Sequence, residues 1–153
     1  ALVFSQFVRF LDLIEWRLRR EGLSAAKFDG KVPISTRNTI VSTFQTKPAS
    51  KILLMSLMAG AEGLNLQAAD HVFLMDPWWN PASELQAIQR AHRIGQLRPV
   101  RAMRFVSAGT VEERIIELQK KKQTVFECTV GSSNQALQRL TFDDIEFLFC
   151  GGR

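Results

Sequence analysis

Two arginines and a glutamine near the middle of the chain have residue types and spacing suited to phosphate chemistry. Gln86, Arg90 and Arg93 stand at i, i+4 and i+7, so on a helix their side chains share one face. Leu85 and Ile88 would then turn toward a sheet. Guanidinium groups bind phosphate oxygens in a bidentate manner and stabilise the charge that develops during phosphoryl transfer. Ordinary surface arginines share this spacing, so the spacing alone leaves that alternative open.

The charge around this group indicates a polyanionic partner. Between Leu85 and Val111 the chain carries five arginines and no acidic residue. The net charge of +5 lies entirely in residues 1–104, which hold 14 basic and 8 acidic residues, against 6 and 7 in residues 105–153. Five uncompensated guanidinium groups attract phosphate, although a solvated basic face without a specific partner is the alternative.

Alternating apolar patterns predict an α/β fold whose sheet is mostly parallel, with helices on both faces. Short apolar runs at residues 2–4, 25–28, 51–55, 72–75 and 100–106 predict strands. Helical spacing predicts helices that follow Ser5, span residues 33–44 and 81–93, and begin at Thr110. Asn80 before Pro81 is a strong helix start, and Thr110 with Glu113 forms the pattern of a capping box. Ligands of such a sheet gather at the carboxyl ends of its strands.

Three blocks in the same order resemble the motifs of Snf2-type proteins of helicase superfamily 2. Arg90-Ala-His-Arg-Ile-Gly-Gln96 resembles the family's arginine-finger motif, and Asp76-Pro-Trp-Trp-Asn-Pro81 resembles the block before it. Ala59-Gly60 with Gly63-Leu-Asn-Leu66 resembles the glycine-rich block. Further matches are Val3 to Phe7, Phe28 to Gly30, Arg37 and Phe44, so the resemblance covers residues 1–127.

The resemblance implies a three-layer RecA-like domain, the second of two motor lobes, over residues 1–127, with a C-terminal extension over 128–153. In the family, the arginines of this lobe reach nucleotide bound by the other lobe, and Gln86, Arg90 and Arg93 match these catalytic positions. The matching nucleotide-binding residues are Gly60, Gly63 and Asn65. The matching DNA-binding residues are Ser5, Gln6, Gly30, Arg37 and Trp79, with Trp79 as a brace or wedge.

The same resemblance implies ATP and Mg²⁺ as cofactors, bound mainly by the first lobe of the same parent chain, and no metal site here. The sequence lacks a G-x-x-x-x-G-K-[ST] phosphate loop, so the fragment alone is predicted not to hydrolyse ATP. Double-stranded DNA, free or in nucleosomes, is the implied partner, and the nucleus is the implied location. The implied work of the parent is DNA repair or chromatin remodelling.

The tail resembles the terminus of the nucleotide-excision-repair Snf2 proteins, a branch that carries a RING finger. The matching residues are Thr129 to Gly131, Ala136-Leu137, Leu140-Thr141 and Phe147 to Phe149. Cys128 and Cys150 have no neighbouring cysteine or histidine, so neither a zinc site nor a disulfide is predicted. Without a run of 18 apolar residues or a signal peptide, the chain is predicted to be soluble and to have no membrane partner.

Several alternatives stay open from the sequence. Ser5 could cap the following helix instead of contacting a DNA backbone. Trp78 and Trp79 could be core residues or a stacking platform for a base. The chain could also be a non-catalytic nucleic-acid-binding α/β module, or the C-terminal lobe of an RNA helicase.

Overall fold

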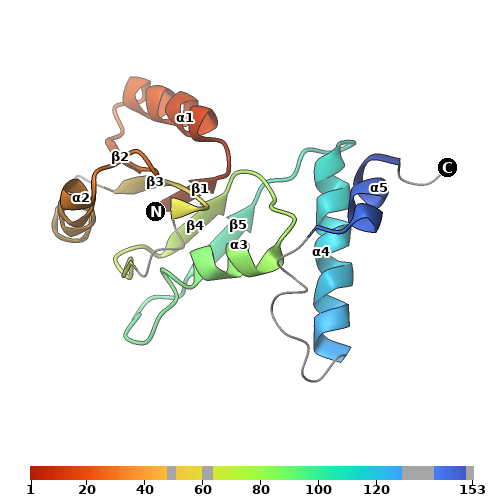
Figure 1. Ribbon diagram of the computed structural model, residues 1–153. Coiled ribbons are helices and arrows are strands. Elements are labelled where there is room, and N and C mark those ends of the chain that lie inside the picture. The colour runs from red at the N-terminus through yellow and green to blue at the C-terminus, as the bar shows by residue number, and fades with distance from the viewer. Residues whose placement is uncertain (48–50, 60–63, 129–139, 151–153) are drawn as a thin grey trace.

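Five parallel strands form one sheet in the order β2-β3-β1-β4-β5 (Figure 1). The computed structural model describes residues 1–47, 51–59, 64–128 and 140–150. The strands are β1 (Leu2–Ser5), β2 (Ala25–Phe28), β3 (Ile52–Ser56), β4 (His71–Leu74) and β5 (Arg101–Arg104). Every pairing in the sheet is parallel. The predicted strands are therefore confirmed, with shifts of one or two residues at their ends.

Helices cover both faces of the sheet, which confirms the predicted three-layer α/β fold. On one face, helix α1 (Val8–Arg20) packs its buried Leu11 against Val3 and Leu54. On the other face, helices α2 (Ile34–Thr46) and α3 (Pro81–Ile88) add Phe44 and Ala87 to the larger apolar core. Buried strands of a parallel sheet read as continuous apolar runs because both of their faces are covered.

Helix α3 begins where the sequence predicts and ends earlier. Asn80 Oδ1 accepts a hydrogen bond of 3.0 Å from the backbone N–H of Ala82, and proline occupies the first helical turn. The prediction that this helix continues to about Arg93 is wrong, because α3 ends at Ile88. The Arg90 carbonyl accepts from the backbone N–H of Leu66 at 3.1 Å, a tertiary contact in place of a further helical bond.

The side chains of α3 also differ from the periodic prediction. Leu85 was expected against the sheet, yet it is 56% exposed. Ala87 and Glu84 are buried in its place, and Ile88 packs against the core as predicted. A polar residue on the inner face shifts the apolar pattern, because the Glu84 carboxylate has partners inside the protein.

Helices α4 (Val111–Cys128) and α5 (Phe142–Cys150) pack against each other beside the sheet (Figure 1). The Thr110 hydroxyl caps α4 by accepting from the Glu112 N–H at 3.2 Å. Glu113 accepts from the Gly109 N–H rather than from Thr110, so the capping box is displaced by one residue. Because α4 crosses residue 127 and residues 129–139 lie outside the described part, the proposed division at 127 stays a prediction.

The buried carboxylate of Glu84 joins four parts of the fold. It accepts from the Trp78 N–H at 2.7 Å and from Gln119 Nε2 of α4 at 2.9 Å. It also forms an ion pair with Arg104 at the end of β5. The Gln119 amide donates to the Trp78 carbonyl as well. Glu84 therefore holds the β4–α3 loop, α3, β5 and α4 together.

A second buried carboxylate, Asp76, joins the carboxyl ends of β1 and β4. It accepts from the Ser5 hydroxyl and, at 2.9 Å, from the backbone N–H of Gln6. Burial raises the pKa of Asp76, and these two hydrogen bonds oppose the rise. The Ser5 oxygen in turn accepts from the Phe7 N–H at 3.0 Å, so the loop after β1 is fixed by side chains at its start.

Glu84→Ala is expected to lower the free energy of unfolding by about 3 kcal/mol, the low end for a broken buried ion pair. The low end applies because the Arg104 side chain is 35% exposed and can be rehydrated. Urea unfolding of the 153-residue chain measures the change. Glu117→Ala on the exposed part of α4 is the control and should cost less than about 0.5 kcal/mol. Equal losses in the two variants would contradict the role of Glu84.

The raised pKa of Asp76 predicts a pH dependence with a defined sign. Since the folded state binds the proton more tightly than the unfolded state, stability from this group falls as pH rises above about 3.9, the ordinary aspartate pKa. Asp76→Asn should therefore gain stability relative to the unsubstituted chain between pH 4 and 7, as measured by urea unfolding. Asp70→Asn should show the opposite trend, because a hydrogen bond from His71 lowers the pKa of Asp70. Parallel pH profiles for Asp76→Asn and the unsubstituted chain would contradict the prediction.

Candidate functional site

The loops that carry Ser5, Gln6, Gly30 and Trp79 leave the sheet at the carboxyl ends of its strands. Asn65, Arg90 and Arg93 lie toward the amino ends of β4 and β5, where Gln96 contacts Ala69 and Arg98 pairs with Asp70. Because all strands are parallel, the ends of β1, β2 and β4 lie on the same side, and ligands of open α/β sheets gather there. Ser5 closes β1 and is fully buried, so its hydroxyl serves Asp76 and the adjacent loop. The backbone N–H of Gln6 is bonded to Asp76 as well, while the Gln6 side chain is half-buried.

Gly30 and Arg37 lie together at the end of β2. Asp29 is buried and accepts from the Lys31 N–H at 2.9 Å, which fixes the turn around Gly30. A Cβ added to Gly30 would meet nothing within 4 Å, so this glycine borders open space. Arg37 Nε donates to the Val32 carbonyl at 3.0 Å, and its guanidinium lies 5.4 Å from the centre of the Phe28 ring. Arg37 is thereby held over the loop that contains Gly30.

Arg90 and Asn65 are brought together by the backbone. The hydrogen bond from the Leu66 N–H to the Arg90 carbonyl places residue 90 beside the segment that follows the glycine-rich block. Asn65 is exposed, and its carbonyl accepts from Gln45 Nε2 of α2 at 2.7 Å. Gly60 and Gly63, the other predicted nucleotide-binding residues, lie outside the described residues.

Gln86, Arg90 and Arg93 do not share one helical face, because the helix ends before Arg90. Gln86 is exposed on α3, Arg90 is half-buried in the following turn, and Arg93 is exposed. The Arg93 carbonyl accepts from the Gln96 N–H at 3.0 Å, which closes a turn through Ile94 and Gly95. Both arginines therefore project from a loop of fixed backbone rather than from a regular helix.

The basic run of residues 85–111 is partly compensated, contrary to the sequence prediction. Arg104 pairs with Glu84, and Arg98 pairs with Asp70 at 2.9 Å. Arg98 also donates to the Ala68 carbonyl at 2.7 Å. These carboxylates come from earlier segments of the chain, so sequence proximity did not reveal the pairs. Arg98 and Arg104 therefore connect parts of the fold to each other through these contacts.

The two tryptophans belong to the β4–α3 loop and lie beside α4. Their ring centroids are 5.8 Å apart, and both residues are half-buried. Trp78 packs on the core, while Lys122 of α4 lies 5.3 Å from the Trp79 ring centroid. The role of Trp79 as a brace or wedge stays a prediction.

Sequence reasoning missed several residues that hold the site. Asp76 had a usable signal, because it follows a buried apolar strand almost directly. The burial of Glu84 had no signal in the sequence, because an acidic residue in a helix usually faces solvent. Gln96 ends the block that resembles the arginine-finger motif, but neither Gln96 nor Gln67 carries a periodic or charge signal, and only the folded chain shows their contacts.

No group of three or more histidine, cysteine, aspartate and glutamate side chains suited to a metal occurs within the described residues. No helix in the described part of the chain is long and apolar enough to span a membrane. Cys150 is an exposed free thiol.

Comparisons with known proteins agree on one family. The helicase conserved C-terminal domain matches residues 1–95. The helicase-like transcription factor CHR27 of Arabidopsis thaliana is 45% identical over 151 residues, which are 97% of this chain and 14% of that protein. The DNA repair protein RAD5 of Saccharomyces cerevisiae is 40% identical over 155 residues, 97% of this chain and 13% of that protein. The ATP-dependent helicase rhp16 of Schizosaccharomyces pombe is 43% identical, with 97% of this chain and 17% of that protein covered.

A solved structure supports the same assignment. The crystal structure of the C-terminal part of the Fun30 ATPase domain superposes with a TM-score of 0.79 at 27% sequence identity. The match covers 96% of this chain and 45% of that one. The chain spans only 12–17% of the length of the curated relatives it matches. The chain therefore belongs to the helicase conserved C-terminal domain family, as the C-terminal RecA-like lobe of a Snf2-family helicase.

Proposed function

We propose that this chain is the second motor lobe of an ATP-dependent translocase that moves along double-stranded DNA in repair or chromatin remodelling. In this proposal Arg90 and Arg93, with Gln86, face ATP bound by the first lobe of the same parent chain. The parent acts in the nucleus and meets DNA free or in nucleosomes. Relatives named as DNA repair proteins and as an ATP-dependent helicase support the class of activity.

The observation that carries the proposal is the fixed loop from Arg90 to Gln96. Its arginines leave a backbone that is bonded to residue 66 at one end and closed by a turn at the other. Preorganised cations are the main means of stabilising the charge that spreads over a transferring phosphoryl group. Arg93 is exposed and therefore available to a ligand that arrives from outside this lobe.

The donors on this lobe fit a polyphosphate. Guanidinium groups at 90 and 93, the Asn65 amide and the backbone at Gly60 and Gly63 are suited to phosphate oxygens. ATP bound there supplies the energy of hydrolysis for movement. The carboxylates that hold Mg²⁺, and the phosphate loop, belong in this proposal to the first lobe.

The proposed DNA-binding surface consists of the loops at the ends of β1 and β2. Gln6 and Gly30 are accessible there, and Arg37 supplies a cation for the DNA backbone. Ser5 acts indirectly, because its hydroxyl is buried against Asp76. Trp79 supports the surface from the side of α4 as a brace.

Arg90→Ala or Arg93→Ala in the full-length parent is expected to lower DNA-stimulated ATP turnover by about 10³-fold while DNA affinity is kept. Steady-state ATPase and DNA binding at one salt concentration measure the two effects. Arg101→Ala is the matched control, because Arg101 is an exposed arginine of the same run that lies on β5, outside the loop from Arg90 to Gln96. Loss of DNA affinity without a specific loss of turnover would favour a non-catalytic nucleic-acid-binding module.

The 153-residue chain by itself is expected to show no DNA-stimulated ATPase, because its sequence holds no phosphate loop. Phosphate release with duplex DNA, with the full-length parent as positive control, tests this expectation. Turnover by the fragment that Arg90→Ala abolishes would contradict it. Stronger stimulation of the parent by RNA than by duplex DNA would favour an RNA helicase.

A further inference from the structure

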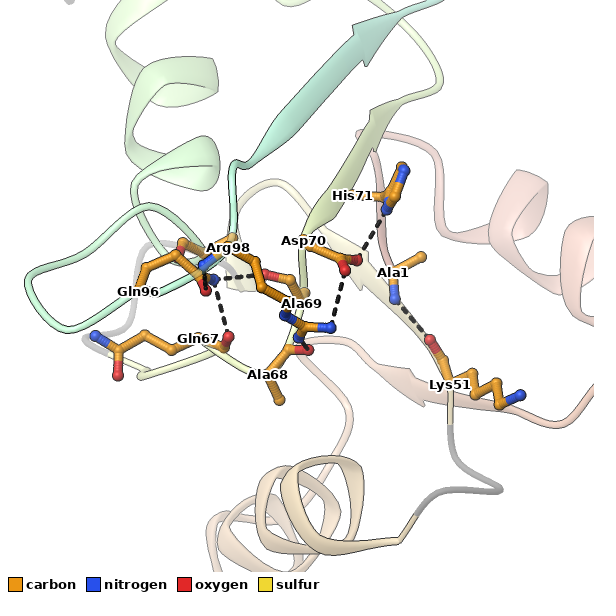
Figure 2. Close-up of polar contacts among 10 residues, drawn as sticks. Ala1, Lys51, Gln67, Ala68, Ala69, Asp70, His71, Gln96 and Arg98 are labelled. Atoms are coloured by element: carbon orange, nitrogen blue, oxygen red, sulfur yellow. Dashed lines mark hydrogen bonds and ion pairs between the residues drawn. The ribbon is translucent and has the colours of Figure 1, made fainter.

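The side-chain amide of Gln96 joins three stretches of backbone. Its Nε2 atom donates to the carbonyls of Gln67 and Ala69, both at 2.9 Å, and lies 3.2 Å from the carbonyl of Ala91 (Figure 2). Its Oε1 atom accepts from the Arg98 N–H at 3.0 Å. Both ends of the amide are therefore used, and the segments 67–69 and 91–98 are fixed to each other.

Gln67 completes the connection from the opposite side. Its Nε2 donates to the Ile94 carbonyl at 2.5 Å. Its Oε1 accepts from Asn65 Nδ2 at 3.3 Å, and its N–H donates to Asn65 Oδ1 at 3.2 Å. One glutamine thus connects a predicted nucleotide-binding residue to the loop that carries Arg93.

The turn between the arginines and Gln96 depends on Gly95. Gly95 has a φ of 98°, a conformation that side chains with a Cβ rarely adopt. A Cβ at this position would also lie 3.5 Å from Gln67 Nε2. The turn reverses the chain so that the Gln96 side chain points back to residues 67 and 69.

Apolar packing holds this loop only near its start, where Ala91 is buried in the larger core. Beyond it, Ile94 is 100% exposed and Leu97 is 95% exposed. The hydrogen bonds of Gln67 and Gln96, together with the bond from Leu66 to Arg90, hold the part of the loop that the core does not cover. Each of these bonds connects it to residues 66–69 or closes it on itself, so the loop and that segment form one unit.

We propose that Gln67 and Gln96 are positioning residues that set the reach of Arg90 and Arg93 toward nucleotide on the first lobe. We call Gln67 and Gln96 the amide clamp. This inference rests on the proposed function, because it assigns a catalytic role to the two arginines. The amide clamp acts on turnover through the arginine loop and has no contact with nucleotide of its own.

Gln96→Glu in the full-length parent tests the clamp, since a carboxylate keeps the size of the side chain and cannot donate to the three carbonyls. Because a displacement of about 1 Å at a catalytic group can lower a rate 10²-fold, kcat of the DNA-stimulated ATPase is expected to fall 10- to 100-fold. The KM for ATP and the affinity for duplex DNA should change less than about twofold. Gln67→Glu, which loses only the donation to Ile94, is a milder second variant with the same expected direction.

Gln89→Glu is the matched control, because it places the same charge beside Arg90 on an exposed side chain outside the clamp. Its kcat should be unchanged, and equal losses in Gln89→Glu and Gln96→Glu would overturn the proposal in favour of a charge effect. Full turnover in both clamp variants, with turnover lost in Arg90→Ala, would overturn the clamp alone. Full turnover in Arg90→Ala and Arg93→Ala would overturn the proposed function and the clamp with it.

Discussion

A buried carboxylate must have partners, and the arrangement of this lobe beyond its sheet depends on that requirement at Glu84. The side chain is 1% exposed and is bonded to the β4–α3 loop, to β5 and to α4. These elements pack little apolar surface against each other, whereas strands β1 to β4 share a continuous core. Polar contacts therefore hold β5 and α4 to the start of α3, while Ala87 and Ile88 pack α3 on the core and so place the start of the arginine loop.

The site is built on two kinds of support. The sheet supplies a rigid edge, where Asp76 holds the loop after β1 and Asp29 holds the turn after β2. The arginine loop packs on the core through Ala91 and is otherwise held by backbone and amide hydrogen bonds to residues 66–69. The two predicted functional surfaces, for DNA and for nucleotide, thus differ in how they are stabilised, and they lie toward opposite ends of the strands.

Local patterns predicted the fold well, because strands and helix starts are decided by residues close in sequence. The runs at β3 and β4 and the Asn80-Pro81 start carry their own signals, and the structure confirms them. The end of α3 and the side that Leu85 faces were predicted wrongly, because Arg90 bonds to the distant Leu66 and Glu84 pairs with the distant Arg104. The roles of the site residues remain predictions, and Gly60 and Gly63 lie outside the described residues.

The loop is exposed at Ile94 and Leu97, and this exposure separates catalytic rate from folding stability, two properties that are coupled in most active sites. Because Ala91 alone connects the loop to the apolar core, changes in core packing away from Ala91 can alter the melting temperature without moving the arginines. Conversely, the geometry of the loop can change while the core keeps its stability. Sequence variation among lobes of this kind thus changes the catalytic rate and the folding stability independently, with few substitutions that affect both.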